Sequence, residues 1–363
     1  MSNKSYTWNP KTPFNDMPHL PPQGVEPDKF SDALQEAREE IIELRGFISG
    51  LPDHTHYLVN PVYLGESISS SEIEDVNTTM IDVMKKRVTQ EVIDDDSAKV
   101  LRYKKAILSG WKKIRNEQPI NQRFIQDMHS ILLPEEKHAL RDEKATIQDG
   151  NTGEARYTPP LPEFFSGLIT NWENFVNTNR AFDSLVRIAI SHYQFEAIHP
   201  FRDGNGRVGR IVAVLQLVKY DMITFPAVHL SRYINKNRET YYRVLLDVTR
   251  HEDWESLITF MLNGLSRQAR QVRVMLRRLE DSMHQTREKI EKETDIYREK
   301  LVESIFNYPV INPTKLSEEM DIHIQTASKY LKKLAEINIL NFSKQGRNSF
   351  YINSEALEII DSH

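Results

Sequence analysis

The chain lacks cysteine and lacks any apolar run long enough to cross a bilayer, and each absence excludes a class of protein. Without cysteine there is no disulfide framework, no thiolate metal site and no cysteine nucleophile. A membrane-spanning helix needs about 18 consecutive apolar residues, which no segment approaches. The N-terminal sequence MSNKSYTWNPKTPFND has no apolar core of a signal peptide. We therefore expect a cytoplasmic protein without membrane contact.

An excess of charge of one sign is also lacking. The 363 residues include 47 basic and 52 acidic side chains, which gives a net charge of −5. This balance gives the molecule as a whole no strong attraction for nucleic acid or anionic lipid. The length is sufficient for two or three domains, each with its own hydrophobic core.

Proline is concentrated in residues 1–27, where helical periodicity is weak. The six prolines of this segment are Pro10, Pro13, Pro18, Pro21, Pro22 and Pro27. The composition predicts an extended N-terminal arm that lies on a surface or is partly disordered.

Beyond the arm, apolar residues recur mostly at helical spacing. A helix is expected from Asp28 until a stop near Gly50. Further helices are expected around residues 71–86, 97–116, 121–133 and 163–178, and the first of these opens with serines suited to capping. One segment differs: KATIQDGNTGEARYTPPLP (144–162) predicts a β-hairpin with a rigid exit. Such a hairpin either lines a cleft or is only a connector.

The last part of the chain follows another pattern. A helical stretch from Trp254 continues into the charged segment 272–300, which is typical of a solvated spacer helix. Three short helices and a hairpin then follow, which is the winged helix-turn-helix order. The third helix has an inward stripe and an outward polar face. The inward residues are Ile324, Ala327, Leu331 and Leu334, and the outward ones are Gln325, Lys329, Lys332 and Lys333. Residues 301–363 carry six Lys/Arg against eight Asp/Glu, so dimerisation or partner docking competes with DNA binding.

The segment HPFRDGNGRVGR (199–210) interrupts two apolar helical stretches with charge. Gly204 and Gly206 allow a tight turn, after which free amides at the start of the next helix favour an anion. Arg207 and Arg210 oppose the dipole of that helix, and this placement is explained if a di- or triphosphate supplies negative charge. Phe201 is interpreted as an anchor that packs inward.

Two further residues of this segment suit reaction chemistry. Asp203 is a carboxylate that would suit Mg²⁺ beside phosphate oxygens. His199 can act as a general base on an attacking hydroxyl. A P-loop is excluded by its missing motif, and an EF-hand by Val208 and Val214 at its glycine and glutamate positions. A zinc site lacks a third ligand, while a purely structural loop would leave the arginines unexplained.

The same segment resembles the Fic-domain motif, H-x-F-x-[DE]-G-N-G-R-x-x-R, at every fixed position. The resemblance continues through residues 230–246, the hairpin and the C-terminal winged helix, and so covers nearly the whole chain. It implies a mainly α fold: a helical Fic core with a β-hairpin flap, plus a C-terminal winged helix-turn-helix domain. It implies the following parts: an arm (1–27), a helical region (28–116), the Fic core (117–270), a linker helix (271–300) and the winged helix (301–363).

The resemblance also implies an activity, AMPylation, in which AMP passes from ATP to a Ser, Thr or Tyr hydroxyl and pyrophosphate leaves. His199 would be the base and Asp203 the ligand of Mg²⁺ or Mn²⁺. The phosphates would lie against Gly204, Asn205 and Gly206, with Arg207 and Arg210 as clamps. Weaker candidates for the nucleotide pocket are Tyr233 and Tyr241. The flap residues expected to dock the target are Thr146, Ile147 and Gln148, although the family's usual Trp and Gly-Gly are absent there.

A second resemblance concerns an inhibitory helix with the pattern [ST]-x-x-x-E-[GN]. Ser70 and Glu74 match it, and Asp75 departs from it. It implies that Glu74 pairs with Arg210 and so competes with the γ-phosphate of ATP. The alternative interpretations are an ordinary surface glutamate and, for the whole chain, a nucleotide-sensing DNA-binding regulator with a non-catalytic core. The resemblance also implies a homodimer; the target, which includes the chain itself as a candidate, is not specified.

Overall fold

The computed structural model describes residues 8–51, 58–89, 95–150 and 152–362. The first seven residues of the predicted arm and Asn151 of the predicted turn lie outside this range. The chain divides into two compact units that interleave in sequence. The first unit comprises Met1–Ile41, Lys105–Pro226 and Tyr233–Arg267, and the second comprises Ile42–Lys104, Ala227–Arg232 and Gln268–His363. In the described ranges no helix has the length and apolarity that a bilayer-crossing segment needs.

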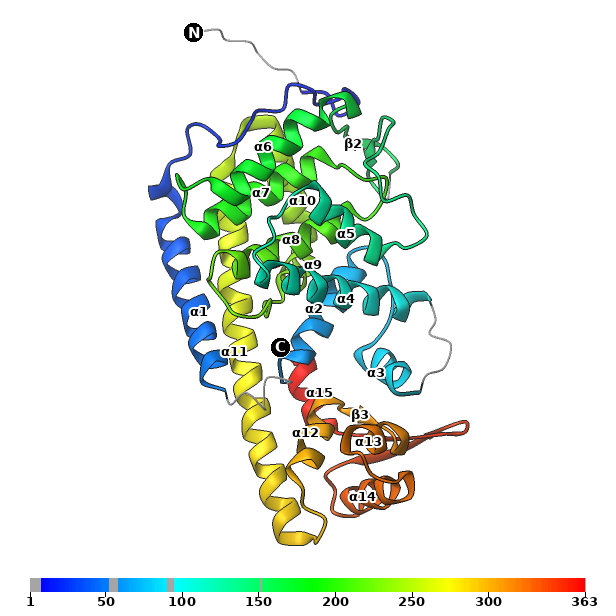
Figure 1. The fold of residues 1–363 in the computed structure, drawn as a ribbon. Helices are drawn as coiled ribbons and strands as arrows, with labels where there is room; N and C mark the ends of the chain where they lie inside the picture. Colours follow the sequence, from blue (N-terminus) through cyan, green and yellow to red (C-terminus); the bar gives the residue numbers. More distant parts are fainter. Residues whose placement is uncertain (1–7, 52–57, 90–94, 151, 363) are drawn as a thin grey trace. The chain divides into compact units, whose positions relative to one another are not determined.

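The first unit is built mainly from helices (Figure 1). Its elements, some of which continue into the second unit, are η1 (Pro27–Phe30), α1 (Ser31–Gly50), α4 (Asp95–Arg115), α5 (Gln122–Leu132), β1 (Ile147–Gln148), β2 (Ala155–Tyr157), η3 (Pro162–Phe164), α6 (Phe165–Thr178), α7 (Ser184–Ile198), α8 (Asn205–Lys219), α9 (Leu230–Lys236), α10 (Arg238–His251) and α11 (Trp254–Glu293). The helices expected at 28–50, 97–116, 121–133 and 163–178 are confirmed within a few residues.

Helices α7 and α8 form the centre of this unit. Almost every residue of both helices is buried, as is typical of helices in the centre of a large helical unit. They pack against each other, and α6 packs against α7, as Figure 1 shows in green. The loop between α7 and α8 is therefore fixed at both ends by buried helices, so the side chains that it carries have a rigid support.

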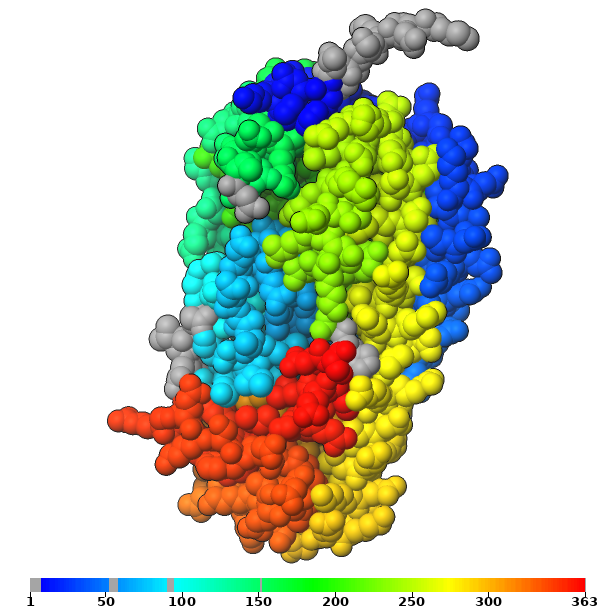
Figure 2. Space-filling model, turned by 180° about the vertical axis from the view of Figure 1, so that it is seen from behind, coloured from blue at the N-terminus to red at the C-terminus, as the bar shows by residue number. Residues whose placement is uncertain are grey.

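The described part of the arm lies on the surface of the first unit, as predicted. Figure 2 shows it in dark blue against green residues of the hairpin region. The Phe14 amide donates to the Thr158 carbonyl at 3.0 Å, and the Leu20 amide donates to Asn171 Oδ1 at 2.7 Å. Phe14 and Leu20 are buried, which explains why a segment with few internal hydrogen bonds stays in place.

The predicted hairpin is confirmed, although its strands are short. Strand β1 pairs antiparallel with β2 with Ile147 opposite Tyr157, and the register shifts after that pair. The Tyr157 hydroxyl donates to the Ala197 carbonyl at 2.8 Å, near the end of α7. A two-stranded hairpin is marginal by itself. This bond explains how the hairpin is held beside the α7–α8 loop.

The second unit contains helices around a small sheet. Its further elements are α2 (Asn60–Glu72), α3 (Met80–Thr89), α12 (Glu299–Asn307), β3 (Val310–Ile311), α13 (Pro313–Met320), α14 (Ile324–Glu336), β4 (Asn341–Gln345), β5 (Asn348–Ile352) and α15 (Ser354–Asp361). The prediction of one helix over 71–86 is wrong, because α2 ends at Glu72 and α3 begins at Met80. The serines expected to cap that helix are instead buried in the last turn of α2.

The C-terminal order α12, β3, α13, α14, β4, β5 confirms the winged helix. The sheet order is β3-β5-β4, all antiparallel, so β3 adds a third strand to the two that were predicted. Ala327, Leu331 and Leu334 of α14 are buried as expected, but Ile324 is 44% exposed. Ile324 is the first residue of the helix, where the inward face has no neighbouring turn to pack against. The two units do not follow the five predicted sequence blocks, whose boundaries stay a prediction.

Candidate active site

The loop between α7 and α8 lies in the first unit and carries the residues of the Fic-like motif. His199 follows α7 with φ 50° and ψ 59°, and its amide donates to the Phe195 carbonyl at 3.0 Å. Gly204 precedes α8 with φ 77°. Two left-handed residues thus reverse the chain between the helices, and such a conformation is easiest for glycine. A β-carbon on Gly204 would also lie 2.9 Å from Leu133 Cδ1.

The orientation of the His199 ring defines its tautomer. Its Nδ1 lies 3.3 Å from the Glu196 carbonyl oxygen. Because a carbonyl oxygen only accepts hydrogen bonds, Nδ1 carries a proton, and in the neutral ring Nε2 then carries the lone pair. The side chain is half-buried. This neutral tautomer is the form that a general base requires.

Residues from other parts of the first unit brace the loop. The Asn205 side chain accepts from the Phe201 amide and donates to the Phe201 carbonyl, both at 2.8 Å. The Phe201 ring is fully buried and stacks on His129 at 4.2 Å, in agreement with its predicted anchoring role. His129 Nε2 donates to the Asp203 carbonyl at 3.1 Å, and burial lowers the pKa of His129. The loop is therefore held from inside by Asn205 and from α5 by His129.

The first turn of α8 presents backbone amides without a hydrogen-bond acceptor among the described residues. The amides of Asn205, Gly206 and Arg207 find no acceptor within the described chain, and no side chain caps the helix. The Gly204 amide is bonded to Asp203 Oδ1 at 2.6 Å. Free amides at the start of a helix, together with the positive end of its dipole, form a site for an anion.

Two buried arginines follow these amides. Arg207 is 6% exposed, and one of its terminal nitrogens lies 3.2 Å from Asp203 Oδ2. Its Nε is buried and has no hydrogen-bond partner among the described residues. Arg210 is 2% exposed. Burial, and secondarily the charge of Arg210, lower the pKa of His192 to about 4, so this histidine is neutral. A buried guanidinium with an unused donor is suited to a phosphate oxygen.

The donor set also fits a metal ion that is shared with phosphates. The Asp203 side chain is 61% exposed. The described residues contain no cluster of three or more His, Cys, Asp or Glu that could hold a metal ion unaided. Mg²⁺ commonly binds one or two carboxylates and completes its shell with phosphate oxygens and water. Asp203 therefore fits an ion that arrives with a nucleotide.

Arg141 contributes to this loop and was missed in the sequence. It is 2% exposed, and its guanidinium donates to the carbonyls of His199 at 2.8 Å, Glu143 at 2.8 Å and Pro160 at 2.6 Å. Its own amide donates to the Pro200 carbonyl at 2.8 Å. Burial lowers the pKa of Arg141 to about 10, so it remains charged at neutral pH. One buried cation thus ties the motif loop to both ends of the hairpin.

The predicted flap residues lie on the first strand of that hairpin and just before it. Thr146 and Gln148 are exposed and Ile147 is half-buried. An ion pair between Asp149 and Arg156 closes the hairpin. Among the described residues β1 pairs with β2 alone, so its other edge has no neighbouring strand.

The two tyrosines considered for the nucleotide pocket are buried. Tyr241 is 3% exposed, and its hydroxyl lies 2.8 Å from His192 Nε2. Tyr233 is 9% exposed and packs so closely on Gly264 that a β-carbon there would lie 2.7 Å from its ring. Burial raises the pKa of Tyr233. The role of both residues toward a nucleotide stays a prediction.

The predicted inhibitory segment belongs to the second unit. Ser70 is fully buried near the end of α2, and Glu74 is exposed in the turn that follows. Asp75 has φ 58°, and the Val76 amide donates to the Ser71 carbonyl at 3.1 Å. This left-handed helix end favours glycine or asparagine, the residues that the inhibitory pattern specifies. Asp75 adopts the same conformation, so the departure from the pattern leaves the turn intact.

Comparison with known proteins agrees with this geometry. Residues 119–217 match the Fic/DOC family, and residues 31–112 match the Fic/DOC family N-terminal region. Residues 282–356 match the C-terminal domain described as protein adenylyltransferase SoFic-like.

Individual relatives match limited parts of the chain. A probable protein adenylyltransferase from Aquifex aeolicus (strain VF5) is 36% identical over 85 residues, which are 23% of this chain and 27% of that protein. A Fido domain-containing protein from Dictyostelium discoideum is 34% identical over 103 residues, which are 24% of this chain and 71% of that protein. The match thus spans under a third of the Aquifex relative but most of the Dictyostelium protein.

A solved structure extends the similarity to the whole fold. A Fic family protein from Desulfovibrio desulfuricans G20 superposes with a TM-score of 0.59 at 19% identity, covering 92% of this chain and 98% of that one. At this identity the similarity concerns the fold alone. With the motif, the sequence matches and the fold in agreement, the chain belongs to the Fic/DOC family.

Proposed function

We propose that this protein transfers AMP from ATP to a Ser, Thr or Tyr hydroxyl of a target protein and releases pyrophosphate. The single observation that carries the proposal is the start of α8, where three unused amides adjoin a buried arginine with an unused Nε. The names of several relatives, which are protein adenylyltransferases, support the same activity. A target protein follows from the proposed reaction, and the chain itself is one candidate target.

In this proposal the phosphates of ATP lie over the first turn of α8. The amides of Asn205, Gly206 and Arg207 would donate to phosphate oxygens. The side chains of Arg207 and Arg210 would hold the terminal phosphates, since a guanidinium matches phosphate geometry. Asn205 supports this site indirectly, because both polar atoms of its side chain already hold Phe201 in place.

The chemistry assigned to His199 follows from its tautomer. Its Nε2 takes the proton of the target hydroxyl while the hydroxyl oxygen attacks the α-phosphorus of ATP. A bond forms between that oxygen and the α-phosphorus, and the bond from the α-phosphorus to the bridging oxygen of the β-phosphate breaks. Pyrophosphate leaves with the electron pair of the broken bond. A positioned base of this kind contributes roughly 10²–10⁴-fold to the rate.

Asp203 is the residue that would hold Mg²⁺ or Mn²⁺ in this site. The ion would supply positive charge to the α- and β-phosphates, and the ordinary ligand preference of Mg²⁺ fits one carboxylate plus phosphate oxygens. The carboxylate is held at the start of α8, because its Oδ2 lies 3.2 Å from a terminal nitrogen of Arg207 and its Oδ1 accepts from the Gly204 amide at 2.6 Å.

The hairpin is proposed as the docking site for the target. The unpaired edge of β1 offers backbone groups to an extended segment, a recognised mode of peptide binding. The exposed side chains of Thr146 and Gln148, with the half-buried Ile147, would contact the residues around the modified hydroxyl.

Inhibition by Glu74 is part of the proposal. The family resemblance pairs this carboxylate with Arg210, where it would compete with the γ-phosphate of ATP. Support comes from the turn after α2, which has the left-handed residue that the inhibitory pattern requires. Burial of Ser70 fixes the end of that helix.

The test is AMP transfer by the Glu74→Gly variant in a cell lysate with ATP and Mg²⁺. We expect mass spectrometry to find AMP on a hydroxyl side chain, with more product than the unaltered chain yields. His199→Asn is the blank, because asparagine tolerates the left-handed conformation. Tight nucleotide binding without any AMP transfer would instead favour the nucleotide-sensing regulator. Equal transfer by the Glu74→Gly variant and the unaltered chain would show that Glu74 does not inhibit.

A further inference from the structure

We propose that the winged helix of the second unit binds duplex DNA through α14 and the tip of the β4–β5 hairpin. We call this surface the basic face and define it by Gln325, Ser328, Lys329, Lys332 and Lys333 of α14 with Lys344 and Arg347 of the hairpin. The proposal goes beyond AMP transfer and does not depend on it.

Charge is unevenly distributed over the winged helix. Residues 301–363 carry six cations and eight acids, a balance that does not suggest a nucleic-acid partner. Five of the six cations, however, lie on the basic face, whereas Glu336 is the only one of the eight acids on α14 or the hairpin. The sixth cation, Lys315, is paired with Glu318 and Glu319 of α13. The cations of residues 301–363 are thus concentrated on one surface, and the net charge of the domain does not reveal this concentration.

Most cations of the basic face are available to a partner. Lys329, Lys332, Lys344 and Arg347 are exposed, and in the part of the chain that the structure describes none of them forms an ion pair. Lys333 is half-buried and lies 3.4 Å from Glu336. Exposed cations without partners are the groups that neutralise phosphates, and this neutralisation supplies most of the affinity for DNA.

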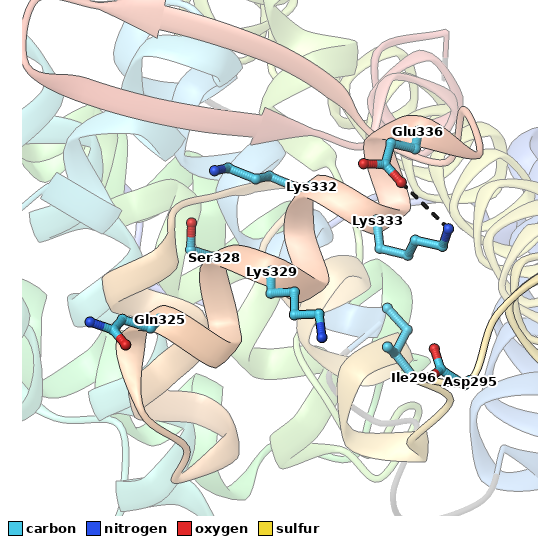
Figure 3. Close-up of a pocket in the computed structure, with 8 residues that line it drawn as sticks. All are labelled: Asp295, Ile296, Gln325, Ser328, Lys329, Lys332, Lys333 and Glu336. Carbon is cyan, nitrogen blue, oxygen red and sulfur yellow. Dashed lines mark ion pairs between the residues drawn. The ribbon is translucent and has the colours of Figure 1, made fainter.

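The surface along α14 is hollowed. A depression of about 620 Å³ runs along α14 and is lined by all five α14 members of the basic face, together with Asp295, Ile296 and Glu336. In Figure 3 Lys329 and Lys333 lie on the side of the helix that faces Asp295 and Ile296, and Ser328 and Lys332 lie on the side of the strands. A helix with polar side chains along its outer side suits the major groove.

The roles within the basic face differ. The lysines would contact phosphates and fix the register of the protein on the duplex. Gln325 and Ser328 can donate and accept hydrogen bonds, as readout of base edges requires, and they lie near the start of α14, where winged and helix-turn-helix proteins read bases. The hairpin tip, with Lys344 and Arg347, would reach a neighbouring phosphate strand or groove.

The test uses the full chain and a fluorescein-labelled duplex of mixed sequence, about two helical turns long, followed by fluorescence anisotropy. We expect binding that weakens between about 50 and 200 mM salt, with a slope of log affinity against log salt of roughly −3 to −4. The Lys329→Ala/Lys332→Ala variant should bind at least about tenfold more weakly, with a slope smaller by roughly 2.

The matched control is Lys105→Ala/Lys112→Ala, two exposed lysines of α4 in the first unit. It changes net charge equally and should leave the affinity within about twofold. No duplex binding at low salt, or equal losses in both variants, would overturn the proposal. Binding of a protein partner that requires Lys329 and Lys332, without duplex binding, would also overturn it. AMP transfer should be the same in both variants, so failure here is distinguishable from failure of the proposed function.

Discussion

At the scale of single residues, the proposed base His199 is held by Arg141, whose guanidinium donates to the backbone carbonyl of His199. The motif residues could be predicted because they all lie within twelve positions, and a short loop brings them together whatever the rest of the fold. Arg141 and His129 could not be predicted, because each reaches the loop from a distant position in the sequence. Neither residue belongs to a recognisable motif, so the sequence around each gives no sign that it contacts the loop.

His199→Asn tests the proposed base with little disturbance of the loop. Asparagine tolerates the left-handed conformation of this position but cannot take a proton. We expect AMP transfer to fall by roughly 10²–10⁴-fold. Thermal unfolding monitored by circular dichroism should show a nearly unchanged melting temperature. Transfer within threefold of the parent would show that another group acts as base.

Arg141→Ala tests whether the loop and the hairpin are held by one cation. The change leaves buried carbonyls without donors, and we expect a loss of about 3 kcal/mol in the free energy of unfolding. Urea unfolding measures this loss, and Arg141→Lys is the matched control that keeps the charge.

A positioning role adds a kinetic expectation for the same variants. Arg141→Lys should transfer AMP with a lowered kcat and a nearly unchanged KM for ATP, because the amides proposed to bind the phosphates are on α8. An altered KM with an unchanged kcat would contradict the assignment.

At the scale of elements, sequence periodicity located most helices but misplaced the one that precedes Glu74. The start of α2 is marked by Pro61 in its first turn, and a proline signal of this kind is independent of hydrophobic periodicity. The helix ends at Glu72, before the left-handed Asp75. Because this position is not a glycine, the sequence lacks the usual signal for a helix end. A two-residue strand such as β3 has no periodicity to detect, so the third strand of the winged helix was missed as well.

A buried carboxylate fixes α2 within the second unit. Glu66 is fully buried; its Oε2 accepts from the Ser231 amide at 3.0 Å, and its Oε1 accepts from the Ser231 hydroxyl and from Tyr103 Oη at 3.1 Å. Next to it, His229 Nε2 donates to the Val62 carbonyl at 2.8 Å. The helix that precedes Glu74 is therefore held by buried polar contacts.

Glu66→Ala should weaken this hold, because it leaves buried donors without an acceptor at a cost of about 2–3 kcal/mol. If the position of α2 sets inhibition, AMP transfer should rise, and the same change in the Glu74→Gly chain should add nothing further. Transfer assays on the two single variants and the double variant measure this coupling, with Glu66→Gln as the milder control. An unchanged rate of AMP transfer in a destabilised Glu66→Ala protein would show that the position of α2 does not set inhibition.

At the scale of the whole molecule, buried histidines make stability depend on pH. Burial lowers the pKa of His192 to about 4 and that of His229 to about 3. Both are therefore neutral in the folded chain near pH 5, whereas the unfolded chain binds a proton on each below a pKa of about 6.5. Their contribution to stability is present above that unfolded value and is lost as the pH falls below it.

We expect each of these histidines to remove about 2 kcal/mol of stability between about pH 7 and pH 5. Urea unfolding at both pH values measures the total change. His229→Gln isolates one contribution, since its side-chain amide can still donate to the Val62 carbonyl. An equal pH response in the variant and the parent would contradict the assignment.

The central claim is that the α7–α8 loop directs transfer of the α-phosphoryl group of ATP to a hydroxyl. The most direct measurement compares ATP carrying radioactive phosphorus in the α-position with ATP labelled in the γ-position, using the Glu74→Gly chain in a lysate. We predict that α-label becomes attached to protein, that γ-label does not, and that His199→Asn abolishes the signal. Attachment of γ-label, or α-labelling that survives His199→Asn, would contradict the account.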